Sequence, residues 1–327
     1  MTCSSRFQKS AATSECSRKD NMRNPLFPPR SIPWSICLSA LFLVTSSGRA
    51  AEPSKIIRSE SLHPRINLVT WRSARLNKEK QFCIVFPRKY VAPDSTPPAK
   101  ESPTGWPVLY FLHGRGRHER SLIDDEQTRA QLLNANFIVI LPDGDDSWYI
   151  DSPVSETDQY ESYLTELITL TTATYDLSPQ PSDRAIGGWS MGGYGAMHYL
   201  VSHPEQFSTI VTLIGLVDFP RDGLPAGQSY DVPLARFGDN RDAWPAMNPL
   251  TKVAELRQHA LFLLTAADAF DRTMNENFSR RLDELNISHR YEEIEGGHTF
   301  DVVRTGVARM IPFLNENLST AGNSGSE

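Results

Sequence analysis

Gly188-Trp189-Ser190-Met191-Gly192 is the pentapeptide from which the architecture of this chain can be worked out. It follows a short apolar run over residues 184–188 and precedes a stretch of small residues that is typical of a closely packed helix. A glycine two residues away on either side of the serine leaves room for a turn that larger side chains would block. In such a turn, called a nucleophile elbow, the serine Oγ projects from the top of a sheet. The pattern therefore predicts a strand, an exposed serine and a helix.

The segments around the pentapeptide alternate between apolar runs and helical patterns. Continuous apolar runs, which are typical of parallel strands buried on both faces, lie at residues 108–112, 137–141, 210–216 and 261–264. Helical patterns lie at residues 125–134, 156–175 and 274–285. Two more strands, at residues 65–71 and 81–87, are predicted to form an antiparallel lead-in. This alternation predicts a doubly wound, mostly parallel sheet with helices on both faces.

The composition fits one large α/β domain, because 39% of the 327 residues are apolar. The formal charge is −6, but residues 1–50 hold seven basic and only two acidic residues. The rest of the chain therefore carries 26 basic and 37 acidic residues, a net charge of −11. A body this acidic argues against nucleic acid or an anionic membrane surface as a partner.

Residues 1–50 are predicted to be a signal peptide. The apolar run 36–44 follows Arg23 and Arg30, and residues 48–50 place small side chains at positions −3 and −1 of a cleavage site. The run is short for a bilayer span, and a membrane anchor or a buried strand is the alternative. Met22 is a candidate for the true start of translation. We therefore expect export to a periplasm or to the outside of the cell, without stable membrane insertion after cleavage.

The exported chain is predicted to be one domain over residues 51–318, followed by a disordered tail over residues 319–327. Cys83 is the one cysteine beyond residue 50, so no internal disulfide is expected. It lies in a strand-like segment, where it is expected to be a small buried apolar residue.

The serine of the pentapeptide needs partners, because a hydroxyl is a poor nucleophile at neutral pH. It requires a base within hydrogen-bond reach and a carboxylate that orients the base. We assign the base to His298, which follows the strand-like residues 291–294 and a glycine pair, and precedes a helix. A loop histidine at the carboxyl end of a strand can reach over the top of an open α/β sheet. His198 and His203, on the predicted elbow helix, are interpreted as structural.

The orienting acid is expected at the end of the strand that precedes the histidine. The run 261–264 continues into Thr265-Ala266-Ala267-Asp268, which places Asp268 at the carboxyl end of that strand. Asp268 is therefore our preferred acid. Asp271, three residues later, is its rival, and Asp218, which follows the run 210–216, is a third candidate.

An oxyanion hole requires two backbone N–H groups aimed at the developing negative charge. The amide of Met191, at the start of the elbow helix, is expected to supply one of them. The other is expected from the loop Leu112-His113-Gly114-Arg115-Gly116, which directly follows an apolar strand. The Arg115 amide is the preferred donor and Gly114 the second choice, whereas His113 is expected to be a structural hydrogen-bonding residue.

Two tryptophans are candidate substrate-binding residues. Trp148 follows the strand that ends at Leu141, which places it on the catalytic face, although packing of its long loop is an equal alternative. Trp189, inside the elbow, is also expected to help hold the turn. We expect no cofactor and no metal. The spacing of the nearby acids fits no calcium loop, and they are interpreted as solvated or turn-forming residues. Those acids are Asp143, Asp145, Asp146 and Asp151.

Together these features resemble the esterase branch of the α/β-hydrolases, which includes feruloyl and acetylxylan esterases, esterase D (the S-formylglutathione hydrolase) and the mycolyltransferases. The resemblance covers residues 60–316 and rests on motifs in matching order and spacing. These motifs are Leu112-His113-Gly114, Leu141-Pro142-Asp143-Gly144, Ser147-Trp148-Tyr149, Tyr160-Glu161, residues 188–192, Asn248-Pro249, Asp268 and Gly296-Gly297-His298. It implies the α/β-hydrolase fold and a metal-free hydrolase with Ser190 as nucleophile, His298 as base and Asp268 as acid.

The chain departs from the pattern of this branch in three places. Members usually carry glycine where Thr265 stands, before the acid. The histidine loop often continues to a tryptophan, but here it reads Thr299-Phe300-Asp301. Pro312 interrupts the last helical pattern. None of these changes removes a predicted catalytic group.

Together with the predicted signal peptide, the resemblance implies a secreted serine carboxylic-ester hydrolase that works through an acyl-enzyme, on short acyl or carbohydrate-linked esters such as feruloyl or acetyl esters. The segment 218–244, where many hydrolases carry a lid, is short and rich in Gly, Pro and Asp, so no large lid is expected. The alternatives are an acyltransferase of the mycolyltransferase type, a thioesterase of the S-formylglutathione hydrolase type, and a catalytically silent carbohydrate-binding protein. The oligomeric state is left open.

Overall fold

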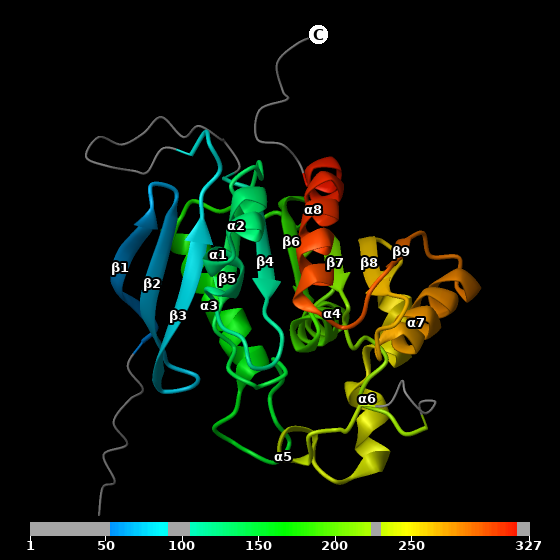
Figure 1. Ribbon diagram of the computed structural model, residues 1–327. Coiled ribbons are helices and arrows are strands. Elements are labelled where there is room, and N and C mark those ends of the chain that lie inside the picture. Colours follow the sequence, from blue (N-terminus) through cyan, green and yellow to red (C-terminus); the bar gives the residue numbers. More distant parts are fainter. Residues whose placement is uncertain (1–52, 91–104, 224–229, 319–327) are drawn as a thin grey trace, which may run out of the picture. The chain divides into compact units, whose positions relative to one another are not determined.

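The computed structural model describes residues 53–90, 105–223 and 230–318 (Figure 1). The chain divides into two units, Met1–Arg49 and Ala50–Glu327, and all of the described residues belong to the second. The predicted signal peptide and the predicted tail lie outside the described residues.

The described residues form a single nine-stranded sheet in the order β1-β2-β3-β5-β4-β6-β7-β8-β9. Strands β1 to β3 pair antiparallel with one another, β3 pairs antiparallel with β5, and the remaining pairs are parallel. The strands are β1 Lys55–His63, β2 Ile66–Ser73, β3 Lys78–Val85, β4 Val108–Leu112, β5 Ile138–Pro142, β6 Arg184–Trp189, β7 Thr209–Leu213, β8 Ala260–Ala266 and β9 Arg290–Ile294. The predicted mostly parallel sheet with an antiparallel lead-in is thereby confirmed, and β1 is an addition to it.

Helices cover both faces of this sheet (Figure 1). The α-helices are α1 Ser121–Asp124, α2 Glu126–Leu132, α3 Tyr160–Thr174, α4 Met191–Ser202, α5 Leu234–Phe237, α6 Trp244–Met247, α7 Arg272–Glu284 and α8 Phe300–Asn317. Short 3₁₀ turns lie at η1 Pro181–Asp183, η2 Arg241–Ala243 and η3 Pro249–Leu256. Helix α8 runs through Pro312 without ending there.

The two faces of the sheet build two separate hydrophobic cores, because successive side chains of a strand point to opposite sides. In β4, Val108, Tyr110 and Leu112 pack into the core that contains residues of α3, α4 and α7. Leu109 and Phe111 of the same strand pack into the core that contains residues of α1, α2 and α8. The continuous apolar runs of the sequence therefore correspond to strands buried on both faces, as predicted.

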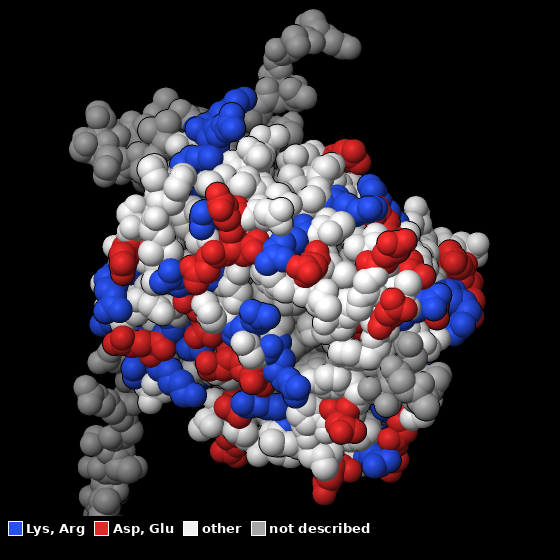
Figure 2. Space-filling view, in the orientation of Figure 1, with Lys and Arg blue, Asp and Glu red and all other residues white. Residues whose placement is uncertain are grey.

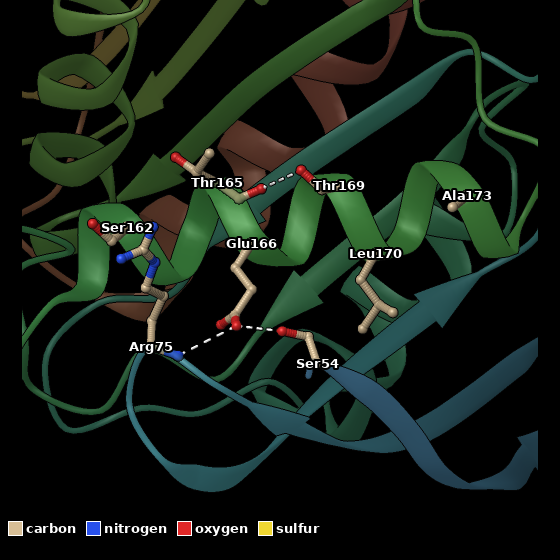
Figure 3. Close-up of a pocket in the computed structure, with 8 residues that line it drawn as sticks. All are labelled: Ser54, Arg75, Ser162, Thr165, Glu166, Thr169, Leu170 and Ala173. Atoms are coloured by element: carbon tan, nitrogen blue, oxygen red, sulfur yellow. Dashed lines mark hydrogen bonds between the residues drawn. The ribbon is translucent and has the colours of Figure 1, made fainter. Parts of the chain in front are cut away.

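The antiparallel lead-in is tied to the rest of the sheet through Glu166 of α3 (Figure 3). Its carboxylate accepts hydrogen bonds from the Ser73 hydroxyl at 2.5 Å and from the Ala74 amide at 2.8 Å, at the turn between β2 and β3. The Ser54 hydroxyl donates to the same carboxylate. These bonds lie beside a surface hollow of about 530 Å³. Glu166 therefore fixes the hairpin on α3.

The described part of the segment between β7 and β8 contains only short helices and turns, α5, α6, η2 and η3, so no large lid is found there.

No helix of the described residues is both long and apolar enough to cross a membrane. Side chains of both charges are interspersed over the face drawn in Figure 2.

Candidate active site

Ser190 stands between the end of β6 and the start of α4, in a conformation that a serine rarely adopts. Its φ is 54° and its ψ is −121°. Such a positive φ costs a non-glycine residue on the order of 1–3 kcal/mol, so the surroundings must enforce it. The Ser190 N–H donates to the Leu213 carbonyl at 3.1 Å, and the Ser190 carbonyl accepts from the Tyr194 N–H at 3.1 Å. The predicted elbow is therefore present and held from both sides.

The two glycines of the pentapeptide are required by close approaches of backbone. A Cβ on Gly188 would lie 2.5 Å from the carbonyl carbon of Gly192, and a Cβ on Gly192 would lie 2.2 Å from the oxygen of Leu112. Backbone atoms at these positions cannot move aside cheaply. The glycines thus let α4 begin directly against β6 and β4, which aims the serine outward.

His298, in the loop between β9 and α8, links Ser190 to a carboxylate. Its Nδ1–H donates to Oδ1 of Asp271 at 2.7 Å, and the Ser190 hydroxyl donates to its Nε2 at 2.8 Å. A carboxylate only accepts hydrogen bonds, so the ring proton belongs on Nδ1 and Nε2 is left with a free lone pair. The structure therefore brings the predicted serine and histidine together in the geometry of a nucleophile and its base.

The carboxylate that contacts His298 belongs to Asp271. The preferred assignment of Asp268 is therefore wrong, and the alternative, Asp271, occupies the position expected of the acid. Strand β8 ends at Ala266, and the chain then makes a tight turn in which the Ala269 N–H donates to the Ala266 carbonyl at 3.0 Å. This turn leaves the Asp268 side chain exposed, while its N–H bonds to the Gly296 carbonyl at 2.9 Å. Asp271, at the start of α7, is fully buried and faces the histidine.

Three hydrogen bonds satisfy the buried carboxylate of Asp271. Besides His298, the Thr265 hydroxyl donates to Oδ2 at 2.7 Å and Nδ2 of Asn275 donates to Oδ2 at 3.0 Å. A buried carboxylate without such partners would cost several kcal/mol. Thr265 and Asn275 were not predicted as site residues. Their signal in the sequence is a polar residue inside an apolar strand and an asparagine one helical turn after the acid.

Asp218, the third candidate acid, is buried but belongs to a different network. Its carboxylate accepts from Nδ2 of Asn248 at 2.9 Å and from Nδ2 of Asn277 at 2.8 Å, and it pairs with Arg221 at 2.5 Å. None of these partners is a histidine, and Asp218 therefore anchors the segment after β7 instead of orienting a base.

The loop after β4 lies directly against the elbow. A Cβ on Gly114 would lie 2.6 Å from Nε1 of Trp189 and 3.3 Å from Cβ of Ser190, so only glycine fits there. In the part of the chain that the structure describes, no hydrogen bond uses the N–H of Arg115 or the N–H of Met191. Both amides are therefore available as donors near the serine.

His113 orients the peptide that carries the Arg115 amide. The Gly144 N–H donates to Nε2 of His113 at 2.9 Å, so the ring proton belongs on Nδ1, which donates to the Gly114 carbonyl at 2.9 Å. In a planar trans peptide the N–H points opposite to the carbonyl. The Arg115 N–H is therefore held on the side of its peptide away from His113.

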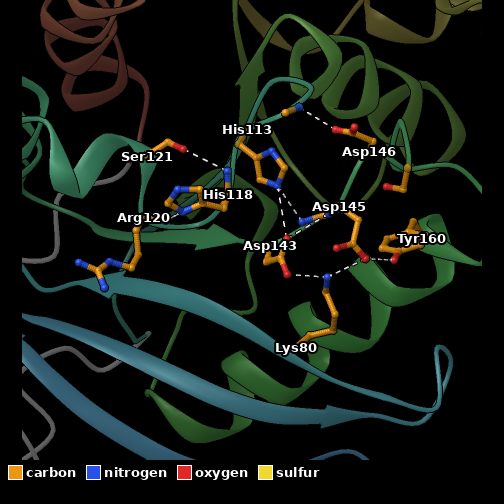
Figure 4. A network of polar contacts seen from close by, with 12 residues as sticks. Lys80, His113, His118, Arg120, Ser121, Asp143, Asp145, Asp146 and Tyr160 are labelled. Carbon is orange, nitrogen blue, oxygen red and sulfur yellow. Dashed lines mark hydrogen bonds and ion pairs between the residues drawn. The ribbon is translucent and has the colours of Figure 1, made fainter.

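An ionic network lies behind His113 (Figure 4). Nζ of Lys80, whose side chain is 4% exposed, pairs with Asp143 at 2.5 Å and with Asp145 at 2.9 Å. Burial alone would raise the pKa of the Asp143 carboxyl. The Lys80 ammonium and the Asp145 N–H, which donates to Oδ1 of Asp143 at 3.1 Å, outweigh burial and hold that pKa well below its usual value. These ion pairs fix the turn at residues 143–145, whose Gly144 N–H donates to His113.

A cavity of about 150 Å³ opens beside Ser190 and His298, and Trp189 forms part of its wall. Trp148 lies elsewhere: it is 1% exposed and stacks on Phe219 with ring centres 4.7 Å apart. The structure thus supports the packing alternative for Trp148 and contradicts its expected contact with substrate.

An aromatic chain nevertheless connects Trp148 to the histidine. Tyr230 lies 5.8 Å from Trp148 and stacks on Phe270 at 5.3 Å, and Phe270 packs on the His298 ring at 4.2 Å. Phe270 therefore packs directly on the imidazole, and no spacing in the sequence connects these rings. No cluster of three His, Cys, Asp or Glu that could hold a metal ion occurs among the described residues.

The chain is similar in sequence to known esterases. A family model described as "Putative esterase" matches residues 73–314. An acetyl esterase from Caldicellulosiruptor saccharolyticus is 26% identical over 221 residues, which cover 64% of this chain and 83% of that protein. An esterase from Mycobacterium tuberculosis is 26% identical over 231 residues, which cover 60% of this chain but only 49% of that protein. The chain thus spans about half the length of the mycobacterial relative.

Solved structures show the same fold. An S-formylglutathione hydrolase from Agrobacterium tumefaciens superimposes with a TM-score of 0.65 at 18% identity, covering 81% of this chain and 100% of that one. An identity this low supports the fold alone.

Proposed function

Because the chain belongs to the "Putative esterase" family and is a carboxylic ester hydrolase, we propose that it hydrolyses esters through an acyl-enzyme formed on Ser190. The observation that supports this proposal most strongly is the unbroken chain of hydrogen bonds from Ser190 through His298 to Asp271, at 2.8 and 2.7 Å. A neutral imidazole with its proton on Nδ1 has the tautomer that a general base needs here.

The reaction begins when Ser190 Oγ attacks the ester carbonyl carbon while Nε2 of His298 takes the hydroxyl proton. The amides of Arg115 and Met191 donate to the oxyanion, and Asp271 stabilises the imidazolium that has formed. Nε2 then gives its proton to the leaving alkoxide, which leaves an ester on Ser190. In the second half, His298 deprotonates a water molecule that attacks this ester, and Ser190 recovers the proton as the acid departs.

We propose short acyl esters or carbohydrate-linked esters, such as acetyl or feruloyl esters, as the substrates. The cavity beside Ser190 holds only about 150 Å³, which suits a small acyl group. The described segments carry no large lid over it, so a bulky alcohol such as a sugar has room outside. The acetyl esterase named above is consistent with this choice.

We also propose that the protein is exported through the signal peptide at residues 1–50. The support is the sequence alone: a basic stretch, an apolar run and small residues before position 51. Expression of the full chain and N-terminal sequencing of the exported product tests this. A product that begins at residue 51 is expected, and retention of the full chain inside the cell would contradict it.

The proposed nucleophile can be tested by exposing the protein to a fluorophosphonate and measuring its intact mass, beside a Ser190→Ala variant. We expect one covalent adduct on the parent and none on the variant. A folded parent that takes up no reagent would show that Ser190 is not activated, and would shift the assignment to a carbohydrate-binding role without catalysis. A panel that includes esters and thioesters then separates the esterase from a thioesterase.

A further inference from the structure

Two arginines of the loop after β4, Arg115 and Arg117, line the cavity beside Ser190. Both side chains are exposed. The Arg115 guanidinium lies 5.3 Å from the ring centre of Tyr230, and the Arg117 guanidinium lies 5.3 Å from the ring centre of Phe300. Basic side chains border the hollow in the middle of the face that Figure 2 shows. The two cations therefore rest on aromatic rings at the cavity mouth, which limits their freedom before any ligand arrives.

Neither guanidinium has a carboxylate partner within the described residues. The contrast with their neighbours is clear. Arg304 lies over the same Phe300 ring at 5.0 Å, but it donates to Asp125 at 2.7 Å and also pairs with Asp301. Arg120, on the same loop as the two free arginines, pairs with Asp124 at 2.8 Å.

The carboxylate of Asp146 is bonded to the backbone of this loop. Asp146 accepts from the Gly116 N–H at 2.6 Å, between the two arginines in sequence. This bond holds the loop, and within the described residues Asp146 forms no ion pair with either guanidinium. The chain beyond residue 50 carries 37 acidic against 26 basic residues, yet two cations beside the serine stay unpaired. The two unpaired guanidinium groups are therefore available to an anionic ligand.

We propose that the substrate carries an anionic group, a carboxylate, sulfate or phosphate, which Arg115 and Arg117 bind at the cavity mouth. This inference rests on the proposed esterase function. A guanidinium binds such oxygens through paired, charge-assisted hydrogen bonds. Because the Arg115 amide also faces the oxyanion, the anionic group lies within one side-chain length of the scissile ester, on its acyl or its alcohol part.

The test measures kcat/KM on two matched pairs of esters. For the acyl side, the monoester of succinic acid with 4-nitrophenol is compared with 4-nitrophenyl butyrate. For the alcohol side, 4-acetoxybenzoate is compared with its methyl ester. We expect the parent to prefer the anionic member of at least one pair by about 10-fold or more, since hydrogen bonds between charged partners are stronger than those between neutral ones. The preference should shrink as salt is added.

The variants Arg115→Gln, Arg117→Gln and the double variant should lower this preference stepwise, while Arg117→Lys should keep part of it. Arg120→Gln, a change on the same loop at a paired arginine, should leave the preference intact. The ratio is taken within one preparation, so a partly unfolded variant does not distort it. Equal rates on both members of both pairs, or a preference that survives the double variant, would overturn the inference. Absence of turnover on every ester would instead count against the proposed function.

Discussion

Asp271 combines complete burial with a carboxylate, and its three donors explain how the protein tolerates it. One donor is the His298 imidazole, and the other two, Thr265 and Asn275, come from β8 and α7. They hold Oδ2, which leaves Oδ1 to accept from Nδ1 of His298. Each carboxylate oxygen thus has its own donors, and a rotation of the histidine ring would break its hydrogen bond to Oδ1.

Replacing Asp271 with Asn should lower kcat/KM by roughly 10³–10⁴-fold, because an amide no longer favours the proton on Nδ1 and the wrong tautomer faces Ser190. Asp268→Asn is the matched control, since the Asp268 side chain is exposed. Steady-state kinetics on a neutral ester gives both values. If Asp268→Asn were the damaging change and Asp271→Asn the mild one, the assignment of the acid would be reversed.

Thr265→Val should weaken the support of Asp271 without changing the shape of the strand. We expect a loss of about 1 kcal/mol in the free energy of unfolding and a several-fold fall in kcat, because one donor to a buried carboxylate is removed. Thr212→Val, in the neighbouring strand β7, is a closely matched control, since the Thr212 hydroxyl is buried without a hydrogen-bond partner. Urea unfolding and kinetics of both variants check this, and equal effects would contradict the role given to Thr265.

The loop after β4 is proposed to act through its backbone, because the Arg115 N–H is the proposed oxyanion donor. His113 bonds to the Gly144 amide on one side and to the Gly114 carbonyl on the other, so it spans the loops after β4 and β5. Asp143, Asp145 and Lys80 stabilise the far end of this connection. The element therefore links the antiparallel lead-in, through Lys80 of β3, to the proposed oxyanion hole.

His113→Ala should lower kcat by about 10- to 100-fold with little change in KM, because a displaced oxyanion donor costs transition-state stabilisation. His113→Asn should restore part of the activity, since its Nδ2 can replace the donor at Nδ1. His118→Ala serves as a control on the exposed part of the same loop. A change confined to KM, or no rescue by asparagine, would argue that His113 only stabilises the fold.

Asp143 contributes to the free energy of unfolding of the whole domain, and this contribution depends on pH. Its pKa in the folded protein is held below the usual value, against the effect of burial, by the Lys80 ammonium and by the hydrogen bond from the Asp145 N–H. Its contribution to stability is therefore complete above the unfolded pKa of about 3.9 and is lost as pH falls below that value toward the lower folded pKa. The free energy of unfolding of Asp143→Asn should be lower than that of the parent at pH 7. It should also fall less steeply below pH ~4, and parallel pH profiles would contradict the account.

The sheet, Ser190 and His298 could be predicted because each depends on a local pattern. Buried parallel strands appear as continuous apolar runs, and the elbow requires glycines at fixed spacing. Strand β1 was not predicted, because it is an edge strand whose residues are mostly exposed and polar, so it carries no continuous apolar run.

Other features depend on how the chain turns in three dimensions, which local patterns do not record. The turn after β8 decides that Asp271 rather than Asp268 meets the histidine, and both positions are equally acidic in the sequence. Trp148 lies on a loop at the catalytic end of the sheet, but Phe219 and Phe237, from a distant segment, enclose it. Burial by a distant segment cannot be deduced from the loop's own residues.

The sheet places the carboxyl ends of β4, β6, β8 and β9 on one side of the domain. The loops that follow these strands meet around Ser190. We propose that this serine carries the acyl group during turnover. The most direct measurement is to mix the protein with a 4-nitrophenyl ester, quench with acid during the first turnovers, and map the acyl group by peptide mass spectrometry. We predict the acyl group on Ser190, and its absence from the Asp271→Asn sample taken at the same time. Rapid ester hydrolysis with the acyl group on another residue, or with Ser190→Ala as active as the parent, would contradict the account.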